Sequence, residues 1–210
     1  MKKFLRRAVF LLLVPALLLP CAGCGEKATF TFADGPEWAR EFPAQMPPVD
    51  LGAEDWVCLT GTDLEVSEFV IPETHKGRPV LAIASGAFMT GRIASPRRVE
   101  MPSVVVICDE GMANTFRLAE VVFRDIRYIG RMAFEECSSL TELVFPACLE
   151  VIAEGAFAGC TGLTEVRFEG DPVLKNCFPA NPGLVFYGQP GGNVEEYARA
   201  WGIAFEALAA

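Results

Sequence analysis

Two stretches of the sequence, IGRMAFEECSSLTELVF at residues 129–145 and IAEGAFAGCTGLTEVRF at residues 152–168, are two copies of one unit. Their first residues, Ile129 and Ile152, lie 23 positions apart. The Ala-Phe pair, the cysteine and three apolar positions near the end of each copy coincide. Self-similarity at such a period indicates a stacked repeat architecture.

Each unit ends in a predicted short strand with the pattern Leu140-x-x-Leu143-x-Phe145. Alternate side chains of a strand point to opposite faces, so we expect Leu143 and Phe145 to point inward and Glu142 and Val144 outward. The preceding Ile-x-x-x-Ala-Phe-x-x-Cys segment should form the opposite wall, as a helix or a 3₁₀ turn. One unit cannot bury this apolar surface alone, whereas stacked units can. The predicted fold class is therefore an α/β solenoid.

Weaker copies flank the central pair. They start at Ile83 and Ile107, and a degraded copy covers residues 174–186. The copy at Ile83 needs two extra residues around Ser95-Pro96 to bring its strand into line. We expect a short array of about four to five units of about 22–24 residues, which exceeds the roughly three repeats that stability requires.

The pattern I-x-x-x-A-F-x-x-C-x-x-L-x-x-L-x-F resembles the BspA-like (treponemal-type) leucine-rich repeats of bacterial surface proteins. An opening hairpin within residues 59–80 and a closing segment within residues 187–205 are also similar to that family. The resemblance implies a leucine-rich-repeat array with a short-strand sheet on one face and a cap at each end. It also implies surface display, adhesion and binding of host or neighbouring-cell proteins, and it brings no common catalytic residues.

Five segments follow from this interpretation. We expect a signal peptide over residues 1–24, a tether containing proline and aromatic residues over 25–55, an N-terminal cap over 56–82, leucine-rich repeats over 83–186 and a C-terminal cap over 187–210. The end units of a solenoid lack one neighbour, which is why caps are expected. A pure linker rarely carries as many aromatic residues as this tether does, so docking of part of it on the first repeat stays an alternative; these residues are Phe30, Phe32, Trp38 and Phe42. Within the tether, Pro36 at a first-turn position favours a short helix over residues 36–42.

The first 24 residues have the form of an export signal. A basic start precedes an apolar region at residues 8–19, which is short for a membrane span. Cys21-Ala22-Gly23-Cys24 resembles a bacterial lipoprotein box with Cys24 as the lipidated residue, although Cys21 stands where leucine is usual. The protein is then expected at the outer face of the cell membrane. The alternative is an ordinary signal peptide and a secreted product.

The charge balance excludes some partners. The formal net charge is −9, and because the signal segment carries four basic residues and no acidic ones, the chain without it has a net charge of about −13. Such a charge disfavours nucleic acid and anionic lipid. Contact with the membrane is therefore expected through the lipid anchor alone.

The cysteines are interpreted by their place in the repeat. Cys137 and Cys160 occupy one repeat position and are expected to be free buried thiols. Whether off-pattern cysteines form disulfides stays open for Cys58, Cys108, Cys148 and Cys177. No C-x-x-C pair survives removal of the leader, and the single histidine, His75, is expected to be solvated in a loop beside Lys76. We expect no metal and no cofactor.

The outward strand positions form the candidate partner face. Aligning the strands gives ten residues: Arg98, Glu100, Glu120, Val122, Arg124, Glu142, Val144, Glu165, Arg167 and Glu169. Glu120, Glu142 and Glu165 should form a row of like charges, which is mildly destabilising. That row suits a basic partner or a divalent cation. The simpler interpretation is a solvated acidic face relieved by the neighbouring arginines.

These observations favour an exported binding and adhesion module that engages a protein on a host or neighbouring cell. The alternatives are a structural envelope protein without a specific ligand and a secreted hydrolase. We expect no enzyme, because the one histidine lies outside the repeats and no H-E-x-x-H or G-x-S-x-G motif occurs.

Overall fold

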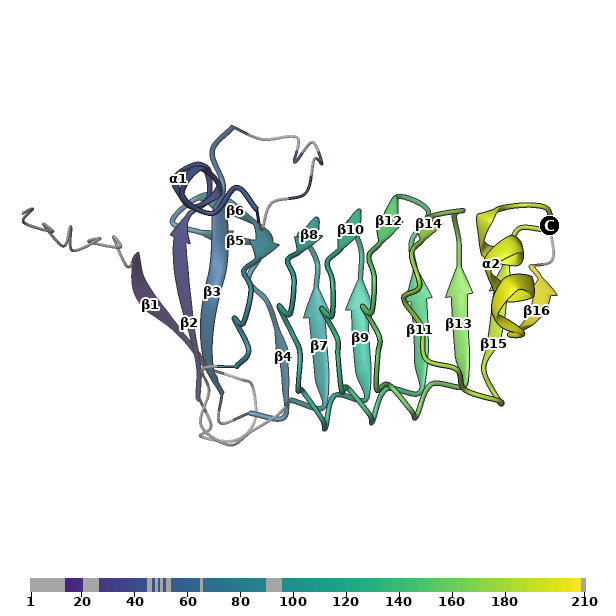
Figure 1. The fold of residues 1–210 in the computed structure, drawn as a ribbon. Coiled ribbons are helices and arrows are strands. Elements are labelled where there is room, and N and C mark those ends of the chain that lie inside the picture. Colours follow the sequence, from purple (N-terminus) through teal and green to yellow (C-terminus); the bar gives the residue numbers. More distant parts are fainter. Residues whose placement is uncertain are drawn as a thin grey trace, which may run out of the picture.

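The structure is a computed structural model. It describes residues 14–20, 27–44, 47, 49, 51, 54–64, 66–89 and 96–208, with residues 14–20, 27 and 64 described by their backbone alone. The chain winds as a β-solenoid whose coils stack along one axis, with the longer strands standing side by side (Figure 1). The prediction of a solenoid is confirmed.

A row of strands of three or four residues each forms one side of the solenoid, and these strands run parallel to one another. We call the outward surface of this row the sheet face. The row consists of β4 (Glu68–Val70), β7 (Arg98–Met101), β9 (Glu120–Phe123), β11 (Glu142–Phe145), β13 (Glu165–Phe168), β15 (Val185–Gly188) and β16 (Ala204–Ala207). It divides into two ladders, β4-β7-β9 and β11-β13-β15-β16.

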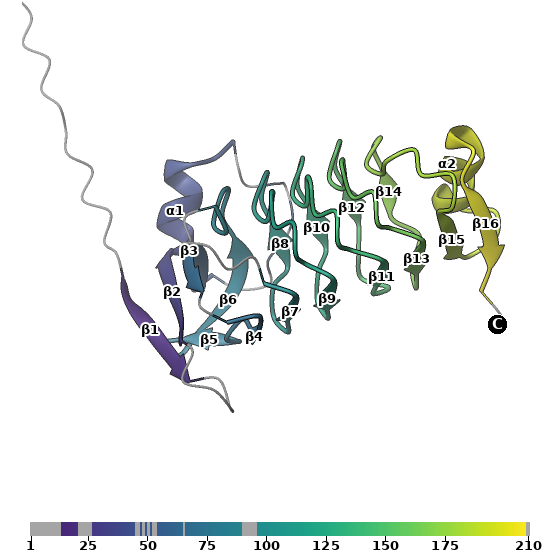
Figure 2. The same ribbon diagram turned by 90° about the horizontal axis from the view of Figure 1, so that it is seen from below.

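A second row of parallel strands forms another side of each coil, and Figure 2 shows it beside the first row. It consists of β6 (Arg78–Ile83), β8 (Val106–Ile107), β10 (Tyr128–Ile129), β12 (Val151–Ile152) and β14 (Val173–Leu174). The first residue of each repeat falls in one register, so that Ile129 lies between Ile107 and Ile152. Residues that align between repeats in the sequence thus lie next to each other in the stacked coils.

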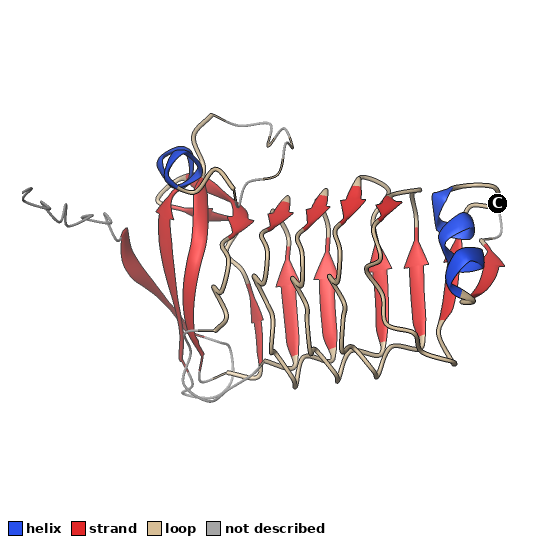
Figure 3. Cartoon of the chain, in the orientation of Figure 1, coloured by secondary structure: helices blue, strands red, loops and turns tan. Residues whose placement is uncertain are grey.

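The third wall corrects the α/β assignment, because turns form it instead of helices. Among the described residues the helices are α1 (Gly35–Glu41) and α2 (Asn193–Trp201), near the two ends of the molecule (Figure 3). Each turn wall contains a residue with positive φ, such as Met132 at 52° and Gly155 at 66°. Backbone N–H groups there bond to the next coil, as from the Phe134 N–H to the Ala156 carbonyl oxygen at 2.8 Å. These features are incompatible with a continuous helix, whose N–H groups bond within the helix.

The array begins one strand earlier than predicted. Strand β4 lies in the segment assigned to the N-terminal cap, yet it pairs in parallel with β7 exactly as one repeat strand pairs with the next, with Phe69 opposite Val99. Phe69 and Ile71 are buried with the repeat core. The sequence-based count of four to five units is therefore too low.

One continuous apolar core fills the solenoid. Phe134, Phe157 and Phe178 stack along the turn wall with ring centroids 5.2 Å and 4.9 Å apart and interplanar angles of 5°. Burial of such rings dominates core energetics, and offset stacking adds about 0.5–1.5 kcal/mol per pair. The repeated phenylalanine therefore ties each coil to the next.

The segment predicted as a tether is folded against the start of the solenoid. Antiparallel strands β2 (Lys27–Asp34) and β3 (Val57–Leu64) form a sheet that continues through β6, and β5 (Thr74–His75) pairs with β6. Side chains with large apolar surfaces are buried there, namely Phe30, Phe32, Trp38 and Trp56. A solvated linker would not bury its aromatic residues. Phe30 and Phe32 extend the core of the solenoid, whereas Trp38 and Trp56 belong to a second apolar cluster.

Helix α1 agrees with the helix expected over residues 36–42. Asp34 precedes it as N-cap and accepts a hydrogen bond from the Glu37 backbone N–H at 2.9 Å. Arg78 on β6, which lies beyond β3 in the sheet, binds the same carboxylate, Nη2 to Oδ2 at 2.8 Å. Helix α1 is thereby linked to β6, because the Asp34 carboxylate binds both the start of the helix and the Arg78 side chain.

Strand β1 (Val14–Pro20) pairs antiparallel with β2 and lies within the predicted signal peptide. Cys24 and the basic start of the chain lie outside the described residues. The export signal and lipidation stay predictions. No helix within the described residues is long and apolar enough to cross a membrane.

Helix α2 covers the other end of the core. Its N-cap, Gly192, has no side chain, and the Asp171 carboxylate accepts hydrogen bonds from the Asn193 and Val194 backbone N–H groups at 3.0 Å and 3.1 Å. The Tyr197 hydroxyl accepts from the Cys177 backbone N–H at 3.0 Å. The free N–H groups at the start of α2 are thus bound by a carboxylate of the chain itself, that of Asp171.

Candidate binding surface

The candidate residues align across the sheet face as the sequence predicted. Arg98 lies opposite Glu120, and Glu142 lies opposite Glu165. Val144 lies opposite Arg167 in the next column. Arg124 and Glu169 follow directly after β9 and β13 and are exposed.

Arg98 neutralises one part of this surface. Its Nε lies 2.9 Å from Glu120 Oε1, and its Nη1 bonds the Glu100 carboxylate. The hydrogen bond to Glu120, followed by that to Glu100, raises the pKa of Arg98. One guanidinium therefore satisfies two carboxylates, which is the fork geometry that arginine favours.

Glu142 and Glu165 are in a different situation. They are exposed on adjacent strands of one ladder, and no ion pair reaches either of them within the described part of the chain. The predicted row of three glutamates is thus divided, because Glu120 turns to Arg98 and no ladder joins β9 to β11. The described residues contain no group of three His, Cys, Asp or Glu side chains that could hold a metal ion.

Two residues of the sheet face were missed from the sequence. Val70, 47% exposed, lies opposite Glu100, and Tyr187 lies opposite Arg167. The Arg167 guanidinium carbon is 4.7 Å from the centre of the Tyr187 ring, within cation–π range. Both would have been found by extending the strand alignment into β4 and β15.

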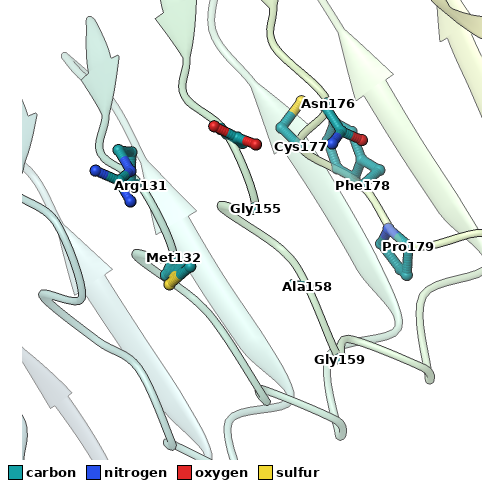
Figure 4. Close-up of a pocket in the computed structure, with 10 residues that line it drawn as sticks. Arg131, Met132, Gly155, Ala158, Gly159, Asn176, Cys177, Phe178 and Pro179 are labelled. Atoms are coloured by element: carbon teal, nitrogen blue, oxygen red, sulfur yellow. The ribbon is translucent and has the colours of Figure 1, made fainter.

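A shallow hollow of about 350 Å³ opens on the turn wall, away from the sheet face (Figure 4). Small residues at Gly155, Ala158 and Gly159 leave it open between Met132 and Pro179. The charged side chains at its margin belong to Arg131 and Glu154, and both residues are exposed.

The repeat cysteines are buried thiols, as predicted. Cys160 Sγ donates to the Phe134 carbonyl oxygen at 3.1 Å, and Cys137 Sγ donates to the Met112 carbonyl oxygen at 3.5 Å. Burial raises the pKa of Cys137 to about 12 and raises that of Cys160 as well. The described cysteines are all free, and Cys148 is the exposed one among them.

His75 does not behave as a solvated loop histidine, and that prediction was wrong. The side chain is buried at 3% exposure, and neither ring nitrogen has a hydrogen-bond partner among the described residues. Burial, then Lys76 and Arg78, lowers its pKa. The hairpin that carries it folds back onto β2, so the imidazole packs against Phe32.

The chain belongs to the BspA-type leucine-rich repeat family. The model of the BspA type leucine rich repeat region matches residues 64–182 in six copies, which is more than half of the chain. The match begins before β4, in agreement with the early start of the array. A search of the curated proteins found no match.

Two solved structures share the fold. A leucine-rich repeat protein from Bacteroides capillosus is 24% identical with a TM-score of 0.52, and the match covers 67% of this chain and 94% of that one. The pneumococcal vaccine antigen PcpA is 20% identical with a TM-score of 0.52. That match covers 82% of this chain and 44% of PcpA.

Proposed function

We propose that this chain is an exported, lipid-anchored module that binds proteins and mediates adhesion through its sheet face. The observation that carries the proposal is the exposed surface of β9, β11 and β13. Among the described residues, no ion pair neutralises Glu142 or Glu165 there, and the side chain of Val144 is half exposed. A parallel sheet usually has both faces covered. A regular, uncovered and chemically mixed sheet suits a macromolecular partner.

The proposed location is the outer face of the cell membrane. The support is the export signal at the start of the sequence, with Cys24 as the lipidated residue, together with membership of a family of bacterial surface repeats. PcpA, which shares the fold, is described as a pneumococcal vaccine antigen. The proposed partner is a protein on a host or neighbouring cell.

The second candidate is a structural envelope protein without a specific ligand. It is favoured by Arg98, which pairs with Glu100 and Glu120 and so leaves part of the sheet face self-neutralised. We propose no catalytic role. His75 is buried, and the thiols of Cys137 and Cys160 have raised pKa values that disfavour the nucleophilic thiolate.

Export and anchoring are tested by intact mass and membrane fractionation of the protein expressed with its own signal. A Cys24→Ser variant is the control. The proposal expects a diacylglycerol-sized mass increase and membrane association for the wild type, and a soluble product for the variant. An unmodified wild-type protein in the medium would exclude the lipid anchor.

Binding through the sheet face is tested by comparing two triple variants of equal charge change. Glu120→Gln, Glu142→Gln and Glu165→Gln alter the sheet face, whereas Glu110→Gln, Glu135→Gln and Glu154→Gln alter the turn wall. The sheet-face variant should lose surface proteins that the wild type and the turn-wall variant both capture. Unchanged capture by the sheet-face variant would exclude the sheet face as the binding surface, and no capture by the wild type would favour the structural candidate.

A further inference from the structure

Resting on the proposed function, we infer that the partner presents a strip of lysine or arginine side chains interleaved with apolar ones, which docks across β9, β11 and β13. The proposed occupant is an extended protein segment. We call the surface that this segment would contact the footprint. It is smaller than the set of ten candidate residues, because the charged side chains on either side of it already have partners within the chain.

Charge defines the first half of the footprint. On one flank, Arg98 is shared by Glu100 and Glu120. On the other flank, Arg167 lies over the ring of Tyr187. Between them Glu142 and Glu165 lie directly opposite each other on neighbouring parallel strands, which are about 4.8 Å apart.

Like charges directly opposite each other on neighbouring strands repel, and a cation of the partner placed between the two carboxylates relieves the repulsion. A metal ion is a poorer fit, because no third protein ligand joins the two carboxylates within the described residues. An ammonium or guanidinium group needs no closed coordination shell, since it also donates to water. The surplus of negative charge, −9 for the chain, attracts a basic partner at longer range.

Apolar surface defines the second half. Val144 is 49% exposed, two positions along β11 from Glu142, and Val122 on β9 occupies the corresponding position of the preceding repeat. Two residues along a strand span about 6.6 Å. The face therefore offers charge and apolar contact at the spacing of residues i and i+2 in an extended chain. A partner with a basic residue at i and a branched apolar residue at i+2 presents both side chains on one face and matches both.

The test uses the purified protein and two synthetic probes of equal length, one repeating Lys-Ser-Val-Ser and the other repeating Glu-Ser-Val-Ser, so that the charged and apolar side chains share one face of the extended probe. Binding is measured by fluorescence anisotropy at low and at physiological salt. Glu142→Gln with Glu165→Gln is the test variant. Glu110→Gln with Glu154→Gln, on the turn wall, changes the net charge equally and is the control.

The lysine–valine probe should bind and the glutamate–valine probe should not. The test variant should weaken binding about ten-fold, and added salt should weaken it further. Equal loss in both variants would reduce the effect to net charge and overturn the footprint. Failure of the lysine–valine probe to bind would overturn the inference, while capture of surface proteins by the wild-type sheet face would still uphold the proposed function.

Discussion

The imidazole ring of His75 stacks on the phenyl ring of Phe32, with ring centroids 4.4 Å apart and planes inclined by 24°. This contact joins the β5 hairpin to β2. Arg78, on the same hairpin, pairs with the carboxylates of Asp34 and Asp55. The histidine is thus buried beside cationic neighbours, where its neutral form is favoured.

Stability should fall on mild acidification because of His75. Folding lowers its pKa below the ordinary 6.5, so the unfolded chain binds the proton more readily. The associated stabilisation is complete above pH 6.5 and decreases as the pH falls below it. Denaturant unfolding at pH 7.5 and pH 5 measures the difference, and His75→Phe should make the two values more alike.

Titration of Asp34 does not contribute to the change in stability between pH 7.5 and pH 5. Its pKa is lowered from 3.8, first by the hydrogen bond from the Glu37 backbone, so its contribution is lost at a more acid pH. If His75→Phe left the pH dependence unchanged, the buried neutral imidazole would be the wrong explanation.

The phenylalanine stack should dominate repeat stability. Phe157→Ala removes a fully buried ring that contacts both Phe134 and Phe178, and we expect a loss of about 3–5 kcal/mol in the free energy of unfolding. Phe116→Ala is the matched control, because Phe116 is 52% exposed and should cost less than 1 kcal/mol, as surface substitutions usually do. Similar losses in urea titrations of the two variants would contradict the stacked core.

Asp171 should stabilise helix α2. Asp171→Ala removes the acceptor for two backbone N–H groups at the helix start, and we expect a loss of about 0.5–2 kcal/mol. Thermal unfolding followed by circular dichroism measures it. Asp125→Ala, at an exposed loop position, is the control, and equal melting temperatures for the two variants would argue against capping from the preceding repeat.

Thiol reactivity should separate one described cysteine from the others. Native protein treated briefly with iodoacetamide should be labelled at Cys148, and peptide mapping should find the five buried cysteines labelled only after unfolding. Burial protects them, and it also raises their pKa values, as for Cys137. The pKa of Cys148 is raised as well, so its exposure is the property that should make it react. Rapid native labelling of Cys137 or Cys160, or a disulfide between them, would be inconsistent with the stacked thiol positions.

The repeat period was sufficient to predict the stacking order and the exposed columns. Ile129 and Ile152, matched in the sequence, pair in the structure, and so do Glu142 and Glu165. This succeeds because stacked repeats contact their neighbours, so that sequence period becomes spatial register.

The wall opposite the sheet could not be predicted in the same way. The same Ala-Phe pattern fits a helix or a turn, and the positive φ values of Met132 and Glu136 decide between them. A methionine or a glutamate in the sequence does not indicate a positive φ, since positive φ values are uncommon outside glycine. Pairings that depend on contacts between distant segments, such as His75 on Phe32, also left no local signal.

The most direct measurement is site-specific photo-crosslinking on intact cells, with benzoylphenylalanine placed at Val144 or at Val173. The two valines are similarly exposed, at 49% and 46%, but Val144 lies on the sheet face and Val173 lies on β14 in the other strand row. Binding through the sheet face predicts a discrete cross-linked product from Val144 and none from Val173. A product from Val173 alone, or no product from Val144, would contradict it.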